Sequence, residues 1–320
     1  MTPRVLVTGG QGFIGKTVSA RLLEQGLDVR VSTRKKLTCT DPHIECIHTN
    51  DLSSTTNWLP ALQAIDAVIH CAALVSVMRG SEADLLSAFR AVNVEGTLNL
   101  ARQAVAAGVR RFVFVSSIKV NGESTKLGQP FTIDDITAPE DAYGLTKLEA
   151  EQGLLALAEQ TGMEVVILRP PLVYGPNVKG NFASIMQAVK KGIPLPFGAV
   201  NDNLRSMVSV DNLVSLMITC LTHPNAANQV FMVRDGEDLS TAGLLRRLGV
   251  GLGTPARLVP VPQILLRYAA SALGQGDLAR RLLGNLQVDD RKTRELLNWA
   301  PVQGVDDGIN SACSTIFTEK

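Results

Sequence analysis

The chain opens on an apolar run followed by closely spaced glycines, Thr8-Gly9-Gly10-Gln11-Gly12-Phe13-Ile14-Gly15. The glycines at 9, 12 and 15 follow a predicted strand over 5–8 and precede a predicted helix. In such a strand–turn–helix unit the glycines permit the tight turn, the close approach of a pyrophosphate and the close packing of helix on strand. Free N–H groups at the helix N-terminus then favour the anion. The turn predicts dinucleotide binding, whereas the same glycines in another context would indicate only a structural turn.

Short continuous apolar runs alternate with longer helical patterns through the first half of the chain. Strands are predicted at 5–8, 29–33, 44–48, 67–71, 111–116 and 165–169, with helices at 18–24, 83–107 and 142–160 between them. Strands without polar alternation are typical of a parallel sheet that helices cover on both faces. The sequence therefore predicts an α/β fold with a Rossmann-like, doubly wound parallel sheet.

The pattern changes after residue 169. Residues 170–196 are rich in Pro and Gly and carry one predicted helix at 182–191. The segment 207–210, a helix over 211–221 and the segment 229–233 are predicted to return the chain to the sheet, and the chain is mainly helical from 240 onward. We predict a dinucleotide-binding domain formed by 1–170 and 207–235. A smaller, discontinuous and mainly helical substrate-binding domain is predicted from 171–206 and 236–320.

Composition narrows the classes of partner. The formal net charge of +1 and the absence of long Lys/Arg runs give no indication of nucleic-acid binding. The five cysteines and four histidines show no metal-ligand spacing, so we predict no metal and expect thiols in a reducing compartment rather than a disulfide framework. The N-terminus lacks a signal-peptide pattern, and the apolar stretch 264–273 contains Arg267 and is too short to span a bilayer. We expect a cytoplasmic protein that binds small molecules and no membrane.

The end of the second predicted strand bears on the choice between NADP and NAD. It continues as Arg34-Lys35-Lys36 and has no acidic residue to hold a ribose 2′-hydroxyl. An arginine there can instead face a 2′-phosphate, although a solvated basic loop would look the same. NADP is therefore favoured and NAD is the alternative. Further cofactor contacts are predicted after the third and fourth strands, at Asp51, Leu52, Ala72 and Ala73.

A tyrosine and a lysine stand four residues apart near the start of a predicted helix, in Tyr143-Gly144-Leu145-Thr146-Lys147. This spacing places both side chains on one helix face. A cation beside a phenol favours the phenolate and is expected to lower the pKa of the tyrosine, which suits proton transfer. Ser116 and Ser117 lie at the carboxyl end of a predicted parallel strand, at the edge where ligands bind in such sheets.

These motifs, in this order, resemble the extended short-chain dehydrogenase/reductase family from one end of the chain to the other. The matching stretches are TGGQGFIG, HCAA, VNVEGTLNL, VFVSSIKVNG, YGLTK, ILRPPLVYGP and RSMVSVDN. The resemblance implies that Tyr143 is the general acid/base and that Lys147 is its electrostatic partner and a ribose ligand. It assigns the hydroxyl on the substrate oxygen to Ser117, with Ser116 as the less favoured alternative, and makes Asn93 an aid to the active-site helix. Phe13, Ile14 and Pro170 would be further cofactor contacts.

The resemblance also implies ligands for a nucleoside-diphosphate sugar. Asn181 and Arg205 match positions that bind the diphosphate, for which the fork of an arginine is well suited. Leu195-Pro196-Phe197-Gly198 resembles the strand that holds a uracil, with Leu195 and Phe197 as contacts, and Lys119 would be another substrate contact. Family members often pair through two helices, so we expect a homodimer formed by helices near 83–107 and 142–160.

Three sugar-nucleotide reactions share this pattern. Dehydratases of the family carry acidic residues after the catalytic Ser/Thr, where this chain has Ile118 and Lys119. Arg34, Leu172 in place of an asparagine, and Arg281-Leu282-Leu283-Gly284-Asn285 in place of an epimerase Arg-Gly-Asp pattern favour a reductase. We predict NADPH-dependent reduction of the C4 keto group of a UDP-sugar in surface-polysaccharide synthesis, with the proton from Tyr143. A UDP-hexose 4-epimerase with tightly bound NAD is the alternative, and a reductase of a non-nucleotide ketone is the second.

Overall fold

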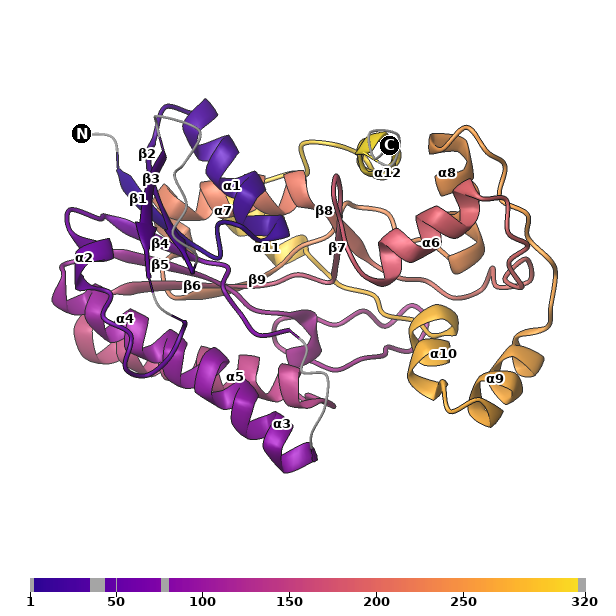
Figure 1. The fold of residues 1–320 in the computed structure, drawn as a ribbon, viewed down its shortest axis with the longest axis horizontal. Helices are drawn as coiled ribbons and strands as arrows, with labels where there is room; N and C mark the ends of the chain where they lie inside the picture. The colour runs from indigo at the N-terminus through magenta and orange to yellow at the C-terminus, as the bar shows by residue number, and fades with distance from the viewer. Residues whose placement is uncertain (1–2, 35–43, 50, 76–80, 316–320) are drawn as a thin grey trace.

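The computed structural model describes residues 3–34, 44–49, 51–75 and 81–315, apart from the side chains of 82 and 277. Its centre is a seven-stranded sheet in the order β3-β2-β1-β4-β5-β6-β9, in which every pairing is parallel (Figure 1). The order reverses between β1 and β4, and in open parallel sheets ligands bind at such a reversal, outside the carboxyl ends of the strands. The predicted fold class is confirmed. The strands are β1 (Arg4–Thr8), β2 (Asp28–Thr33), β3 (Ile44–His48), β4 (Ala67–His70), β5 (Arg111–Val115), β6 (Glu164–Arg169) and β9 (Gln229–Met232).

Helices cover both faces of the sheet, which explains why the strands lack polar alternation. One face packs against α1 (Phe13–Glu24), α7 (Val210–Thr222) and α11 (Arg291–Leu297), around a buried cluster that includes Val18, Leu213 and Leu297. The other face packs against α2 (Leu59–Leu62), α4 (Thr97–Ala106) and α5 (Ala142–Thr161), around Leu62, Leu100 and Leu154.

The helix predicted over 83–107 is divided into three parts. α3 (Glu82–Phe89) and α4 are joined by a seven-residue π-helical stretch, Arg90–Gly96. Gly96 lies so close to Leu52 that an added Cβ would come within 2.7 Å of the leucine Cγ. π-helical turns are rare and occur frequently at functional sites, and this one contains Asn93.

A second core lies beyond the carboxyl edge of the sheet. It is built around a two-stranded parallel pair, β7 (Leu172–Tyr174) and β8 (Met207–Ser209), with α6 (Asn181–Lys190), α8 (Thr241–Gly251) and α12 (Val305–Ser314). The prediction that 207–210 returns to the main sheet is wrong, because β8 pairs with β7, whereas β9 does join the sheet next to β6. The predicted domain boundaries stay a prediction. α9 (Gln263–Ala272) and α10 (Gly276–Leu283) extend from the same end of the molecule (Figure 1).

Three further observations concern the classes of site considered above. Within the described residues no helix combines the length and apolar character needed to cross a membrane. No group of three or more His, Cys, Asp or Glu side chains in that part of the chain is arranged to hold a metal ion. Cys71, Cys220 and Cys313 are free thiols, as expected. Cys46 is disulfide-bonded, so the expectation of a thiol is wrong for this residue. Cys39 and His43 lie outside the described residues.

Candidate active site

The glycine turn lies at the carboxyl end of β1, beside the reversal in strand order. Gly9 adopts φ 68°, and an added Cβ would lie 2.8 Å from the Ala72 nitrogen, so the turn permits no side chain there. A Cβ on Gly15 would lie 2.2 Å from the Gly9 carbonyl oxygen. α1 begins after Gly12 with no side-chain cap and no acidic residue in its first turn, so its N–H groups are available to an anion. The turn has the shape and the donors that a pyrophosphate requires.

The other predicted cofactor residues lie around this turn. Phe13 and Ile14 are half-buried at the start of α1, and Leu52 is buried beside the π-helical stretch. The Ala72 N–H donates to the Thr8 hydroxyl at 3.3 Å, which holds the end of β4 against that of β1. Ala73 is half-buried next to it, and Pro170 is buried at the end of β6, where its carbonyl accepts from the Ile118 N–H at 3.0 Å.

Arg34 does not form a preformed phosphate site. Its side chain is 80% exposed, and one guanidinium nitrogen lies 3.7 Å from a carboxylate oxygen of Asp51, which is 84% exposed. An exposed pair of this kind contributes little to orientation or stability. Lys35 and Lys36 lie outside the described residues. Arg34 is therefore not held in place for a 2′-phosphate, and its position does not distinguish NADP from NAD.

Tyr143 and Lys147 lie in the first two turns of α5, whose N-cap is Asp141; the Asp141 carboxylate accepts from the Gly144 N–H at 2.7 Å. Lys147 is 2% exposed, and its Nζ donates to the Val115 carbonyl at 2.8 Å at the end of β5. The same Nζ lies 5.8 Å from the centroid of the Tyr143 ring. The predicted pair therefore shares one helix face and faces the carboxyl edge of the sheet.

Burial dominates the electrostatics of this pair. It lowers the pKa of Lys147 to about 8 and raises the pKa of Tyr143 to about 12, where the Asp141 carboxylate adds to the rise. The expectation that the lysine lowers the tyrosine pKa is wrong for the protein alone, because desolvation of the phenol outweighs it. In the protein alone, the neutral phenol form of Tyr143 is therefore favoured at neutral pH.

The two adjacent serines have different surroundings. Ser116 is buried, and its hydroxyl donates to the Glu151 carboxylate, which also accepts from Arg169 Nε at 3.0 Å. Ser117 is half-buried and caps the short turn that follows β5, where its Oγ accepts from the Lys119 N–H at 3.3 Å. Its hydroxyl hydrogen remains available to a substrate oxygen. These surroundings favour Ser117 over Ser116 as the candidate catalytic hydroxyl, and both roles stay predictions.

Lys119 is engaged by carboxylates of the protein. Its Nζ forms ion pairs with Asp141 and Glu123, and its side chain is 25% exposed. The Lys119 carbonyl also packs against α5, because a Cβ on Gly144 would lie 2.7 Å from it. Lys119 thus supports the start of the helix that carries Tyr143, and its predicted direct contact with substrate would require these ion pairs to open.

Asn93 connects two parts of the site. Its side-chain amide accepts from the Leu74 N–H at 2.8 Å and donates to the Leu74 carbonyl at 3.0 Å and to the Thr146 hydroxyl at 3.3 Å. These bonds hold the segment after β4 against α5. This is the arrangement that the predicted aid to the active-site helix requires.

Arg205 and Arg281 form a concentration of positive charge. Arg205 is half-buried, and its guanidinium donates to the Gly284 carbonyl at 3.4 Å. Burial and the neighbouring charge of Arg281 lower the pKa of Arg205 to about 10, against the smaller opposing effect of Glu123. The guanidinium groups of Arg205 and Arg281 outnumber the single Glu123 carboxylate that acts on Arg205. The resulting excess of positive charge suits a doubly charged anion. From the sequence, Arg281 was considered only as part of the segment that departs from the epimerase Arg-Gly-Asp pattern. The one sequence signal for a role in anion binding was its position three residues before Gly284.

The remaining predicted substrate residues lie in the second core or at its margin. Asn181 is exposed at the first position of α6, directly after Gly180. Leu195 and Phe197 pack against the second core on a segment that pairs with 257–259; the Leu195 N–H donates to the Arg257 carbonyl at 2.8 Å. The roles of these residues as substrate contacts stay predictions.

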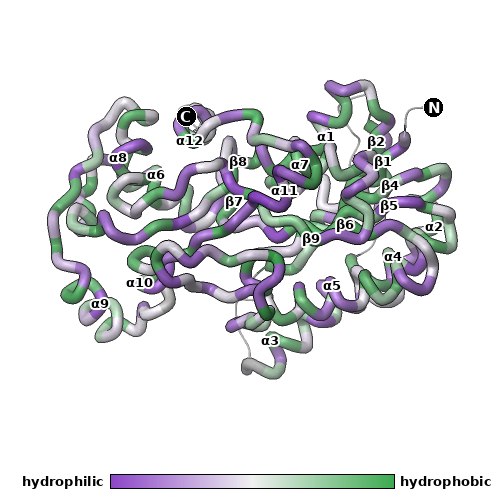
Figure 2. Tube along the Cα trace, turned by 180° about the vertical axis from the view of Figure 1, so that it is seen from behind, coloured by the Kyte–Doolittle hydropathy of each residue, from purple (hydrophilic) through white to green (hydrophobic). Residues whose placement is uncertain are grey.

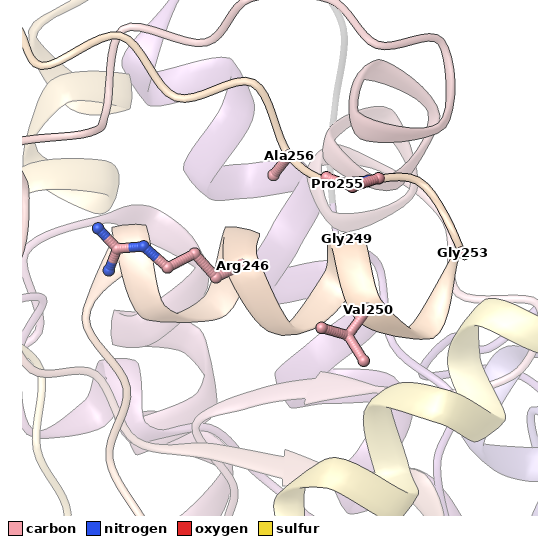
Figure 3. A pocket seen from close by; sticks show the side chains of 6 residues that line it. All are labelled: Arg246, Gly249, Val250, Gly253, Pro255 and Ala256. Atoms are coloured by element: carbon pink, nitrogen blue, oxygen red, sulfur yellow. The ribbon is translucent and has the colours of Figure 1, made fainter.

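A pocket of about 410 Å³ lies elsewhere, on the outer side of α8 (Figure 3). No residue predicted for the site lines it, and its one charged group, Arg246, also bonds to Asn201 at 3.0 Å. It contains no proton-transfer group, so we do not assign it to the active site. The lining residues are Arg246, Gly249, Val250, Gly253, Pro255 and Ala256.

Comparison with known proteins agrees with this geometry. The sequence model of the NAD dependent epimerase/dehydratase family matches residues 5–233. A UDP-glucose 4-epimerase of Vibrio cholerae is 47% identical over 318 residues, 99% of this chain and 96% of that protein. A 3-beta-hydroxysteroid dehydrogenase of Mycolicibacterium neoaurum is 30% identical over 262 residues, 78% of this chain and 70% of that protein. The solved structure of a UDP-glucuronic acid 4-epimerase from Bacillus cereus in complex with NAD superimposes with a TM-score of 0.78 at 21% identity, over 98% of this chain and 96% of that one.

Proposed function

Because the chain belongs to the NAD dependent epimerase/dehydratase family, we propose that it is a UDP-sugar 4-epimerase that retains NAD throughout its catalytic cycle. The single observation that carries this choice is the 47% identity to the Vibrio cholerae UDP-glucose 4-epimerase over 99% of the chain. The NAD in the Bacillus cereus 4-epimerase structure supports NAD over NADP. The reductase interpretation, which depended on Arg34, Leu172 and the segment 281–285, becomes the second candidate.

The residues present fit the cofactor. The glycine turn and the uncapped start of α1 would hold its pyrophosphate, and Lys147 and Tyr143 would face its nicotinamide ribose. When bound, NAD would accept the hydride of C4 and later return it to the other face of the same carbon, and it would add a positive charge beside the buried phenol.

Tyr143 accepts the proton of the C4 hydroxyl while the Ser117 hydroxyl orients the same oxygen. Protonated Lys147 stabilises the phenolate, and it holds its charge below about pH 8. Arg205 and Arg281 anchor the diphosphate while the sugar turns to present its other face, and Tyr143 then returns the proton. Ile118 and the ion-paired Lys119 provide no second acid, so the site has a single proton carrier and does not suit dehydration.

A doubly charged substrate group is the feature that separates this proposal from a hydroxysteroid-type reaction. The 30% identity to a 3-beta-hydroxysteroid dehydrogenase makes oxidation of a hydroxysteroid a further candidate reaction. The charges of Arg205 and Arg281 argue against it, because a neutral sterol would leave Glu123 as the opposing charge beside the half-buried Arg205 guanidinium.

The test incubates the purified protein, without added cofactor, with UDP-glucose or UDP-N-acetylglucosamine and follows the C4 epimer by proton NMR. We expect catalytic formation of the epimer, release of NAD on denaturation, and loss of activity in Tyr143→Phe. Arg205→Ala should raise KM about ten- to a hundredfold with a smaller effect on kcat, whereas the matched change of an outlying arginine, Arg291→Ala, should not. NADPH-dependent reduction of a 4-keto sugar without epimerisation would establish the reductase instead.

The expected pairing of two copies through α3, α4 and α5 is part of the proposal. Analytical ultracentrifugation of the cofactor-bound protein measures it directly, and a monomer would remove it without affecting the assigned reaction.

A further inference from the structure

A buried ion pair lies one turn beyond Lys147 on α5. Figure 2 shows hydrophilic and hydrophobic segments mixed along this helix, which packs against the sheet. Glu151 is a charged residue of the helix that lies in the core and is 2% exposed. Its carboxylate accepts from Nε and Nη2 of Arg169 at 3.0 Å and 2.5 Å, and the arginine side chain is 7% exposed. Desolvation offsets much of the attraction in such a buried pair, so a gain in stability does not explain its presence.

The ion pair holds both ends of the short segment that carries Ser117. On one side, the Ser116 hydroxyl donates to the Glu151 carboxylate. On the other side, Arg169 Nη1 donates at 3.0 Å to the side-chain oxygen of Asn121, which ends the turn that follows β5. Ser117 lies between these two anchors and caps the same turn. The position of the Ser117 hydroxyl therefore depends on the ion pair.

The helix α5 is attached to the same strand end by a second bond. Tyr143, Lys147 and Glu151 follow one another at intervals of four residues, so their side chains lie along one side of the helix. Lys147 Nζ donates to the Val115 carbonyl at 2.8 Å, one residue before the serine that bonds Glu151. Two consecutive residues at the end of β5 are thus held by two consecutive turns of α5. This arrangement fixes the phenol of Tyr143 relative to the hydroxyl of Ser117.

Glu151 also supplies a counter-charge to the buried ammonium group of Lys147. Burial lowers the pKa of Lys147 to about 8, and Cys71 and Glu151 act in the opposite direction. Burial raises the pKa of Cys71 and of Tyr143 to about 12, so both side chains are neutral at pH 7. Burial, with a smaller effect of Lys147, lowers the pKa of His70 to about 3, so its imidazole is also neutral. Among these neighbours, Glu151 is the group that carries a negative charge at neutral pH.

We propose that Glu151 is a positioning residue of the active site, which fixes the Ser117 hydroxyl relative to Tyr143 and keeps the Lys147 ammonium group charged. Arg169 contributes indirectly, because it holds the Glu151 carboxylate and compensates its charge. The role through Ser117 rests on the proposed function, in which Ser117 and Tyr143 act on the same C4 oxygen. The role through Lys147 concerns its charge and is measurable without turnover.

The test compares Glu151→Gln with the wild type. Glutamine keeps the shape and one hydrogen-bond acceptor of the side chain while it removes the charge. Because Arg169 without its partner can prevent folding, a second variant combines Glu151→Gln with Arg169→Gln. The matched control is Glu164→Gln, which removes the carboxylate beside another arginine with a 7% exposed side chain, Arg111, at the opposite end of β5. Circular dichroism and thermal unfolding establish which variants fold.

The first readout is the pKa of Lys147 in the cofactor-free protein. It is followed by carbon-13 NMR of protein labelled at the lysine ε-carbon, with the resonance assigned by Lys147→Met. The proton affinity of Lys147 should fall at least about threefold in Glu151→Gln, should also fall in the double variant, and should not change in Glu164→Gln. An unchanged proton affinity in the Glu151 variants would overturn the proposal, whatever reaction the enzyme catalyses.

The second readout is the epimerisation of UDP-glucose. Glu151→Gln should lower kcat about tenfold with KM within about twofold of the wild type, because the diphosphate site is untouched. The alkaline fall of kcat should also move to lower pH, because the lysine loses its proton earlier. In a Ser117→Ala background the same substitution should lower kcat less than about threefold, because the hydroxyl that Glu151 positions is already absent.

A full tenfold loss in the Ser117→Ala background, or an equal loss of kcat at every pH, would overturn the positioning role. A wild type without epimerase activity would refute the proposed function and with it the role through Ser117. The titration of Lys147 alone would then decide the role through the lysine.

Discussion

Lys147→Met should stabilise the protein at neutral pH while it removes activity. Lys147 is 2% exposed, and burial lowers its pKa from 10.5 to about 8. At about 1.4 kcal/mol per pH unit, this difference corresponds to about 3 kcal/mol of destabilisation while the lysine is charged. The substitution also removes the hydrogen bond to Val115, which offsets about 1–2 kcal/mol of the gain.

The pH dependence isolates the effect of the buried charge. Below pH 8 the lysine is protonated in both the folded and the unfolded chain, so the destabilisation is fully present. Between about pH 8 and pH 10.5 only the unfolded chain holds the proton, so the stability of the wild type rises with pH. Lys147→Met lacks this group. Its stability relative to the wild type should therefore fall by about 2–3 kcal/mol between pH 7 and pH 10.

The assay is urea unfolding of the cofactor-free wild type and variant at both pH values, with free energies taken from linear extrapolation. Lys292→Met, which removes an exposed lysine, is the control and should show the same difference from wild type at both pH values. If Lys147→Met were less stable than wild type by the same amount at pH 7 and pH 10, burial would not govern the charge of Lys147, and the reasoning would fail.

Three further changes test the candidate site. Tyr143→Phe should lower kcat about 10²- to 10⁴-fold while NAD binding, measured by equilibrium dialysis, is unchanged; a smaller loss would assign the proton to another group. Ser117→Ala should reduce kcat about tenfold or more with an unchanged melting temperature, whereas Ser116→Ala should lower the melting temperature because it removes a bond to a buried carboxylate. The reverse pattern would exchange the roles of the two serines. Gly15→Ala should abolish retention of NAD because its Cβ would lie 2.2 Å from a backbone oxygen, whereas Gly276→Ala, where nothing lies within 4 Å, should retain it; equal retention would contradict the predicted turn.

The sheet was predictable because its strands are apolar on both faces and alternate with helices. The segment 44–48 is a strand with the predicted bounds, and the other main strands differ from prediction by a residue at an end. The π-helical stretch around Asn93 was not predictable, since it continues the helical pattern and depends on packing of Gly96 against Leu52. The placement of β8 was wrong because a three-residue strand carries no signal for its partner.

By itself, the sequence determined the family, the glycine turn and the Tyr143–Lys147 pair. These features depend on short-range spacing, and four residues on a helix or a strand followed by a turn have the same geometry wherever they fold. Only the tertiary structure decided the electrostatics. It buried Lys147 and Tyr143, directed Ser116 to Glu151, paired Lys119 with Asp141, and brought Arg281 to Arg205 across a long stretch of chain. Desolvation and charge pairing depend on which distant segments cover a group, and residue spacing does not contain that information.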